Sequence, residues 1–146
     1  MRNYKNLLVI VLATFVLKSY SQDTTDQLYS ECISRVLKEI NFKTNDTIYI
    51  MEGEDLVKLG TNKWRNVKIA NDSFFNAINS NISFRLLKIM PIRVLKDRLL
   101  VGIGFFNFKQ HDGEKEMIAI SNYYFYFNFD CSKRKYFLDR MQKKAL

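Results

Sequence analysis

Residues 98–129 read RLLVGIGFFNFKQHDGEKEMIAISNYYFYFNF. Two runs rich in Leu, Val, Ile, Phe and Tyr, residues 98–109 and 114–129, flank the dipeptide Asp112-Gly113. Asp and Gly both tolerate positive φ, which is the backbone conformation that a two-residue hairpin turn requires. The stretch therefore predicts one long β-hairpin, and the rest of the chain has to be arranged around it.

A turn at this dipeptide also predicts how the two strands pair. Lys109 would lie opposite Glu116, and Gly102 opposite Tyr123; the opposite charges of the first pair favour this register. One face of the hairpin would then carry Leu99, Val101, Ile103, Phe105, Ile118, Ile120, Tyr124 and Tyr126. Because both faces are apolar, we expect other parts of the protein to cover each of them.

The segments before the hairpin predict an α+β protein. Thr24–Ile40 has apolar residues at three- and four-residue spacing, which is typical of an amphipathic helix, and Thr24 with Gln27 fits a capping box. Asp72 or Ser73 is expected to cap a short helix. Short strands are expected at Thr47–Met51, Trp64–Ala70, Phe84–Ile89 and Ile92–Leu95. The predicted fold is α+β: one N-terminal amphipathic helix packed on a mostly antiparallel meander sheet of five to seven strands, all within a single domain over residues 22–146.

The segment after the hairpin allows two interpretations. Residues 132–134 form a plausible turn, after which Lys135–Met141 would be the last strand of the sheet. Alternatively, Ser132 caps a terminal helix that carries Phe137, Leu138 and Met141 on one side. We favour the strand, because strands that follow each other in sequence often pair.

Residues 1–21 have the pattern of a secretory signal peptide. Two basic residues precede the apolar run Leu7–Leu17, and serines stand three and one positions before a cut ahead of Gln22. The run is too short to span a bilayer, which takes about 20 residues. The first cysteine, Cys32, is too far from this cut for a lipid anchor. The expected mature protein is periplasmic or extracellular.

The net charge and the two cysteines bear on possible partners and on the presence of a disulfide. The chain has 23 Lys and Arg against 15 Asp and Glu, a net charge of +8. The leader holds three basic residues and no acid, so its removal lowers the charge from +8 to +5. Cys32 and Cys131 are the only cysteines, and an oxidising compartment favours a disulfide between them. The alternative is two separate buried thiols.

The sequence lacks the motifs of known catalytic and metal sites. The single histidine, His111, stands beside the predicted turn. There is no Gly-x-Ser-x-Gly elbow, no glycine-rich phosphate loop and no His/Cys spacing suited to a metal ion. We therefore predict no catalytic residue, no metal and no cofactor, and we favour a protein that is not an enzyme.

A ligand groove is the first candidate site. Gly102 and Gly104 leave a gap opposite a run of aromatic residues, and together with Tyr123 and Phe125 they could form the floor of a groove for an apolar or carbohydrate ligand. The alternative is that the aromatic rings are the core beneath the helix.

A basic patch near the end of the chain is the second candidate site. Its members are Lys133, Arg134, Lys135, Arg140, Lys143 and Lys144. Such a cluster suits docking on an anionic surface, although lysines on an edge strand also serve to block aggregation.

Two functions of different class follow. The first is a small exported, non-catalytic binding module for a protein, a peptide or a glycan. The second is a polyanion- or membrane-surface-binding protein that acts through the basic cluster, with peripheral membrane contact favoured over nucleic acid. Ionic strength separates them, because only the second predicts an affinity that falls steeply with salt.

Overall fold

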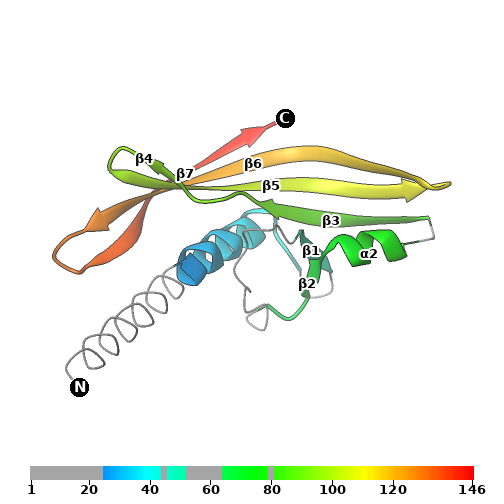
Figure 1. The fold of residues 1–146 in the computed structure, drawn as a ribbon, viewed down its shortest axis with the longest axis horizontal. Coiled ribbons are helices and arrows are strands. Elements are labelled where there is room, and N and C mark those ends of the chain that lie inside the picture. The colour runs from blue at the N-terminus through cyan, green and yellow to red at the C-terminus, as the bar shows by residue number, and fades with distance from the viewer. Residues whose placement is uncertain (1–24, 44–45, 52–63, 79–80) are drawn as a thin grey trace, which may run out of the picture.

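The computed structural model describes residues 25–43, 46–51, 64–78 and 81–146. These residues form an α+β fold with a seven-stranded, largely antiparallel sheet (Figure 1). The strands are β1 (Ile48–Met51), β2 (Val67–Ala70), β3 (Ile82–Ile89), β4 (Arg93–Leu95), β5 (Arg98–His111), β6 (Glu114–Asp130) and β7 (Lys135–Ala145). Their order in the sheet is β2-β1-β3-β5-β6-β7, and β4 pairs with β5 beside this path.

The sheet departs from the predicted meander at its first strands. From β3 onward the neighbours are antiparallel, but β1 lies between β2 and β3 and runs parallel to both. Ile48 and Ile50 of β1 are fully buried. A strand in a central position buries such residues better than an edge strand does, so the apolar content of β1 suits its place inside the sheet.

The helix over residues 25–39 packs on one face of the sheet. Its apolar stripe enters the core with Leu28, Tyr29, Cys32, Ile33, Val36 and Leu37. It ends at Glu39; Asn41, just beyond it, has a φ of 50°, the left-handed conformation common at helix ends, and Phe42 N donates to Leu37 O. Thr24, the expected cap, lies outside the described residues. We call the sheet surface beneath this helix the helix face.

The β5–β6 turn confirms the predicted hairpin. Asp112 and Gly113 both have positive φ, and Lys109 pairs with Glu116. The register then shifts, because Phe105 pairs with Ser121 whereas Phe106 pairs with Ala119. One residue of β6, Ile120, is therefore left over as a β-bulge.

The bulge makes the predicted register wrong for the second half of the hairpin. Beyond it, Gly102 pairs with Tyr124 rather than with Tyr123. A shift of one residue moves every side chain to the other face of a strand. The aromatic residues that join Val101 and Ile103 in the core on the helix face are accordingly Tyr123, Phe125 and Phe127, not Tyr124 and Tyr126.

The second helix, α2 (Asp72–Ala77), lies on the opposite face near the β5–β6 turn. Its cap is Asn71, one residue before the predicted position, and Asn71 Oδ1 accepts a hydrogen bond from Phe74 N at 2.9 Å. An aromatic cluster joins it to the sheet: Tyr49, Phe74, Phe75, Phe84 and Phe108. Each face of the sheet thus carries a helix, but at a different end.

The two cysteines are free thiols, so the predicted disulfide is wrong. Cys32 faces the core under the helix and is fully buried, whereas Cys131 is exposed in the β6–β7 turn. This turn is held by Asp130, whose Oδ1 accepts hydrogen bonds from Ser132 N, Ser132 Oγ and Lys133 N. The segment after it is strand β7, which confirms the strand interpretation over the helix.

Candidate functional site

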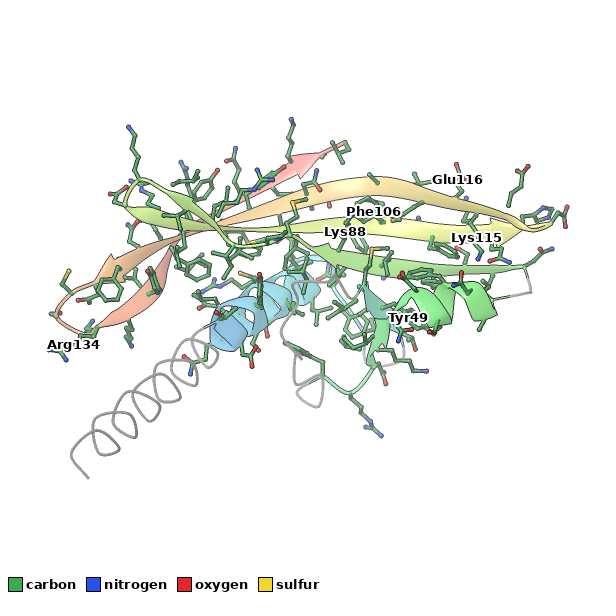
Figure 2. The ribbon with its side chains drawn as sticks, viewed as in Figure 1. Tyr49, Lys88, Phe106, Lys115, Glu116 and Arg134 are labelled. Atoms are coloured by element: carbon green, nitrogen blue, oxygen red, sulfur yellow. The ribbon has the colours of Figure 1, made fainter. Side chains whose placement is uncertain are left out.

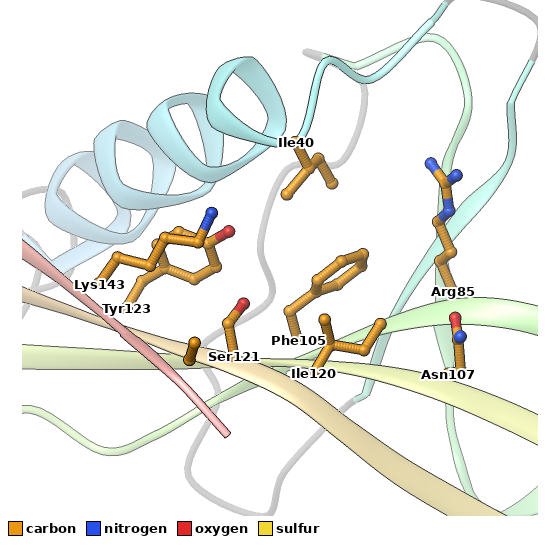
Figure 3. Close-up of a pocket in the computed structure, with 9 residues that line it drawn as sticks. Ile40, Arg85, Phe105, Asn107, Ile120, Ser121, Tyr123 and Lys143 are labelled. Atoms are coloured by element: carbon orange, nitrogen blue, oxygen red, sulfur yellow. The ribbon is translucent and has the colours of Figure 1, made fainter.

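A cavity of about 500 Å³ lies on the helix face of the sheet, just past the end of the helix (Figure 3). Its walls come from the helix end and from β3, β5, β6 and β7. The lining residues are Ile40, Arg85, Phe105, Asn107, Ile120, Ser121, Tyr123, Lys143 and Ala145.

The local sequence explains why the sheet is open here. The helix ends before the sheet does, so it covers Val101 and Ile103 of β5 but leaves Asn107 beyond its last turn. The bulge at Ile120 adds a twist to β6 at the same level. The cavity therefore forms where a finite helix meets a longer, bent hairpin.

Among the described residues, the charged side chains that line the cavity are two cations, Arg85 and Lys143, which lie on opposite sides of it (Figure 3). Arg85 pairs with Asp46 at 3.5 Å and Lys143 pairs with Glu39 at 3.4 Å, but neither carboxylate lines the cavity. Each ion pair is long, and Lys has three donors and Arg five. Both side chains can therefore donate to a further acceptor.

The environment of Lys143 keeps it protonated. The pKa of Lys143 is raised by Tyr123 first and then by Glu39. Its Nζ lies 5.6 Å from the centre of the Tyr123 ring. At neutral pH the cavity therefore presents a full positive charge at this side.

Ser121 contributes a buried polar atom to the floor of the cavity. The residue is 2% exposed, and its Oγ has no hydrogen-bond partner within the part of the chain that the structure describes. Figure 3 shows this oxygen directed towards the cavity. A buried polar group without a partner costs about 1–3 kcal/mol, so the site gains when a polar ligand group meets it.

Among the described residues, no base lies within hydrogen-bond reach of Ser121 Oγ. A serine nucleophile needs a base within hydrogen-bond reach. The only histidine of the chain, His111, is exposed at the β5–β6 turn, where its Nδ1 lies 3.0 Å from Asp112 Oδ2. Glu39, which does not line the cavity, pairs with Lys143.

The four residues of the predicted groove do not come together. Tyr123 and Phe125 are buried on the helix face, as the core alternative predicted. The glycines lie on the other face, where Met90 and Phe106 occupy the space that a Cβ at Gly102 or Gly104 would need.

The predicted basic patch is also spread out. Arg134 lies at the tip of the β6–β7 turn, far from the other end of the sheet (Figure 2). Lys143 lines the cavity on the helix face, whereas Arg140 stacks over the Tyr126 ring at 4.4 Å on the opposite face. Alternation along β7 places Lys144 on that opposite face as well.

Sequence reasoning missed most of the cavity. One signal was present, because Ser121 and Asn122 interrupt an otherwise apolar strand at the point where the bulge occurs. Arg85 and Asn107 carried no such signal, since isolated polar residues on a strand are usually solvated. Only the register places them beside each other.

Comparisons with known proteins add no information on the fold or the cavity. No protein-family model, curated protein or solved structure matches the chain. Among the described residues, no group of three or more His, Cys, Asp or Glu side chains could hold a metal ion. None of the described helices has both the length and the apolar character needed to cross a bilayer.

Proposed function

We propose that this chain is a small exported, non-catalytic binding module whose cavity on the helix face holds a small ligand. The cavity has the size of ligand pockets, which are typically about 300–1,000 Å³. It combines an apolar floor with a few polar groups, which is the usual composition of such sites. The observation that carries the proposal is the buried Ser121 Oγ, which lacks a partner among the described residues and is directed into the cavity.

Export is the second part of the proposal and rests on residues 1–21, which lie outside the described residues. Cleavage ahead of Gln22 would make the helix over residues 25–39 the first element of the mature protein. The measurement is the intact mass of the protein secreted by its native host. A mass that begins at Gln22 supports export, and a mass that begins at Met1 contradicts cleavage.

Ligand binding is tested by a titration of the mature chain followed by amide NMR. The probes are octanoate and 1-octanol, which share an apolar chain and differ in charge. Saturable shifts are expected at Asn107, Ser121 and Lys143, which lie on three different strands around the cavity.

A matched pair of tryptophan variants serves as the control. Ala145→Trp fills the cavity and should abolish these shifts, because Ala145 lines it. Gln142→Trp adds the same ring on the opposite face of β7, where Gln142 pairs with Tyr124, and should leave the shifts in place. No saturable shift with either probe, or equal effects of the two variants, would contradict a binding site in this cavity.

A second candidate, polyanion or membrane-surface binding, is favoured by a different set of cations. The register places cations of several strands on the sheet face turned away from the helix, among them Lys88, Arg93, Arg98, Arg140 and Lys144. This candidate predicts binding to vesicles of anionic phospholipid that falls steeply with salt. If the protein does not bind these vesicles at low salt, this second candidate function is wrong.

A further inference from the structure

We infer that the ligand of the cavity is a small amphipathic carboxylate, whose acid group is held by Lys143 and Ser121 while its apolar body lies on Phe105, Ile120 and Ile40. This inference rests on the binding function proposed above and names the chemical class of the ligand. It follows from the charge, the register and the apolar floor of the site.

The charge of the wall favours an anion. In the part of the chain that the structure describes, Arg85 and Lys143 are the charged residues of the lining, and the acids that pair with them, Asp46 and Glu39, lie outside it. Among the described residues, a carboxylate in the cavity therefore meets two lining cations, and it competes with Glu39, which lies 3.4 Å from Lys143 Nζ. A cationic ligand finds no lining carboxylate among the described residues and would have to displace Arg85 or Lys143 from its ion pair to reach one.

The register places the acid group at one side of the cavity. Ser121 pairs with Ala145, and Lys143 pairs with Tyr123, so Ser121 and Lys143 are diagonal neighbours on the helix face of β6 and β7. Diagonal neighbours lie about 7–8 Å apart at the backbone, which long side chains span. The lysine amine and the serine hydroxyl can thus donate to the two oxygens of one carboxylate.

The rest of the cavity suits a hydrocarbon body. Phe105 and Ile120 form its floor and Ile40 its upper wall, between the two cations (Figure 3). These side chains offer contact but no hydrogen bond. A ligand with charge along its whole length, such as a polyphosphate, would lose hydration there without a replacement.

Arg85 lies at the other side of the cavity and adds positive potential without touching the same acid group. It pairs with Asn107, two residues along β5 from Phe105. We therefore expect its removal to weaken binding less than the removal of Lys143. This difference separates a defined carboxylate site from a general preference for anions.

The test compares octanoate with 1-octanol by calorimetry on the mature chain and its variants. We expect octanoate to bind at least about tenfold more tightly than 1-octanol, and Lys143→Gln to remove that preference. Ser121→Ala should weaken octanoate binding by several-fold, on the order of one lost hydrogen bond, with less effect on 1-octanol.

Lys144→Gln is the matched control, because it makes the same change of charge one residue away on the opposite face of β7. It should leave the octanoate preference intact. An equal loss in Lys143→Gln and Lys144→Gln, or a larger loss in Arg85→Gln, would overturn the placement of the acid group. Equal binding of octanoate and 1-octanol would overturn the carboxylate while the binding function stands, and no binding of either would overturn both.

Discussion

The two faces of the long hairpin are built from the same kinds of residue and are used differently. Tyr123 and Phe125 are buried under the helix, whereas their neighbours Tyr124 and Tyr126 are only half-buried on the other face. These four side chains alternate along one strand, so composition does not separate them. The bulge at Ile120 decides which pair meets the helix. A single extra residue thus selects the core from two equally apolar sets.

Deletion of Ile120 would break this selection and is expected to have the largest effect. Without the bulge, either the residues beyond it or those before it must change faces. We expect a loss of more than about 5 kcal/mol in the free energy of unfolding, which is enough to unfold a typical domain. The measurement is urea denaturation followed by circular dichroism. Ile120→Ala, which keeps the residue count, is the control and should remain folded; a deletion variant as stable as the parent would contradict the role of the bulge.

The replacement of neighbouring aromatic residues sharpens the same comparison. Phe125→Ala empties a fully buried site and should cost about 3–5 kcal/mol in the free energy of unfolding. Tyr124→Ala, on the half-buried face, should cost about 1 kcal/mol. Urea denaturation of both variants gives the values. A larger loss of stability in Tyr124→Ala than in Phe125→Ala would contradict the bulge and support the regular register.

The two glycines of β5 test how tightly the face away from the helix is packed. A Cβ at Gly104 would lie 2.5 Å from Phe106 Cε2, and one at Gly102 would lie 2.7 Å from Met90 Sδ. The aromatic ring is stiff and the thioether is flexible, so Gly104→Ala should destabilise by about 1–3 kcal/mol and Gly102→Ala by less. Thermal or urea unfolding compares the two. Equal costs would mean that the ring moves as freely as the methionine.

The smallest expected effect concerns Cys32, which is buried under the helix. It is a dependence of the free energy of unfolding on pH. Burial first, and then Glu31, raises the pKa of the Cys32 thiol. The unfolded chain loses this proton near its ordinary pKa of about 8.5 while the folded chain keeps it, so stability falls as the pH rises above that value. Between pH 8.5 and 9.5 we expect a loss of about 1 kcal/mol that is absent from Cys32→Ala. An identical pH dependence in both proteins would show that Cys32 is accessible.

Much of the fold was predictable because its signals are local. The turn at Asp112 and Gly113, the apolar stripe of the helix and the strand character of Lys135–Met141 all depend on neighbours in sequence. The bulge was not predictable from alternation, because residues 123–127 of β6 are all aromatic and either register buries aromatic rings. The parallel pairing of β1 was missed for a similar reason, since four residues carry no information on direction.

The candidate site was largely beyond the sequence. The predicted groove joined Gly102 with Tyr123 on the assumption of a regular register, and the bulge places them on opposite faces. Of the predicted basic residues, only Lys143 lines the cavity. The missing part is three-dimensional: Arg85, Asn107 and Ser121 come from three strands and meet only when those strands pair.

The position of β1 has a consequence for the order in which the protein is made. β1 precedes both of its neighbours, β2 and β3, in the chain, so it leaves the ribosome before either strand exists to pair with it. The hairpins β5–β6 and β6–β7 join residues that are close in sequence, and such contacts form fastest. Until β1 inserts beside β3, that strand presents an open edge with Leu86 and Leu87, to which a second nascent chain can add. Synthesis at low local concentration, or a chaperone that covers this edge, would therefore favour the correct fold.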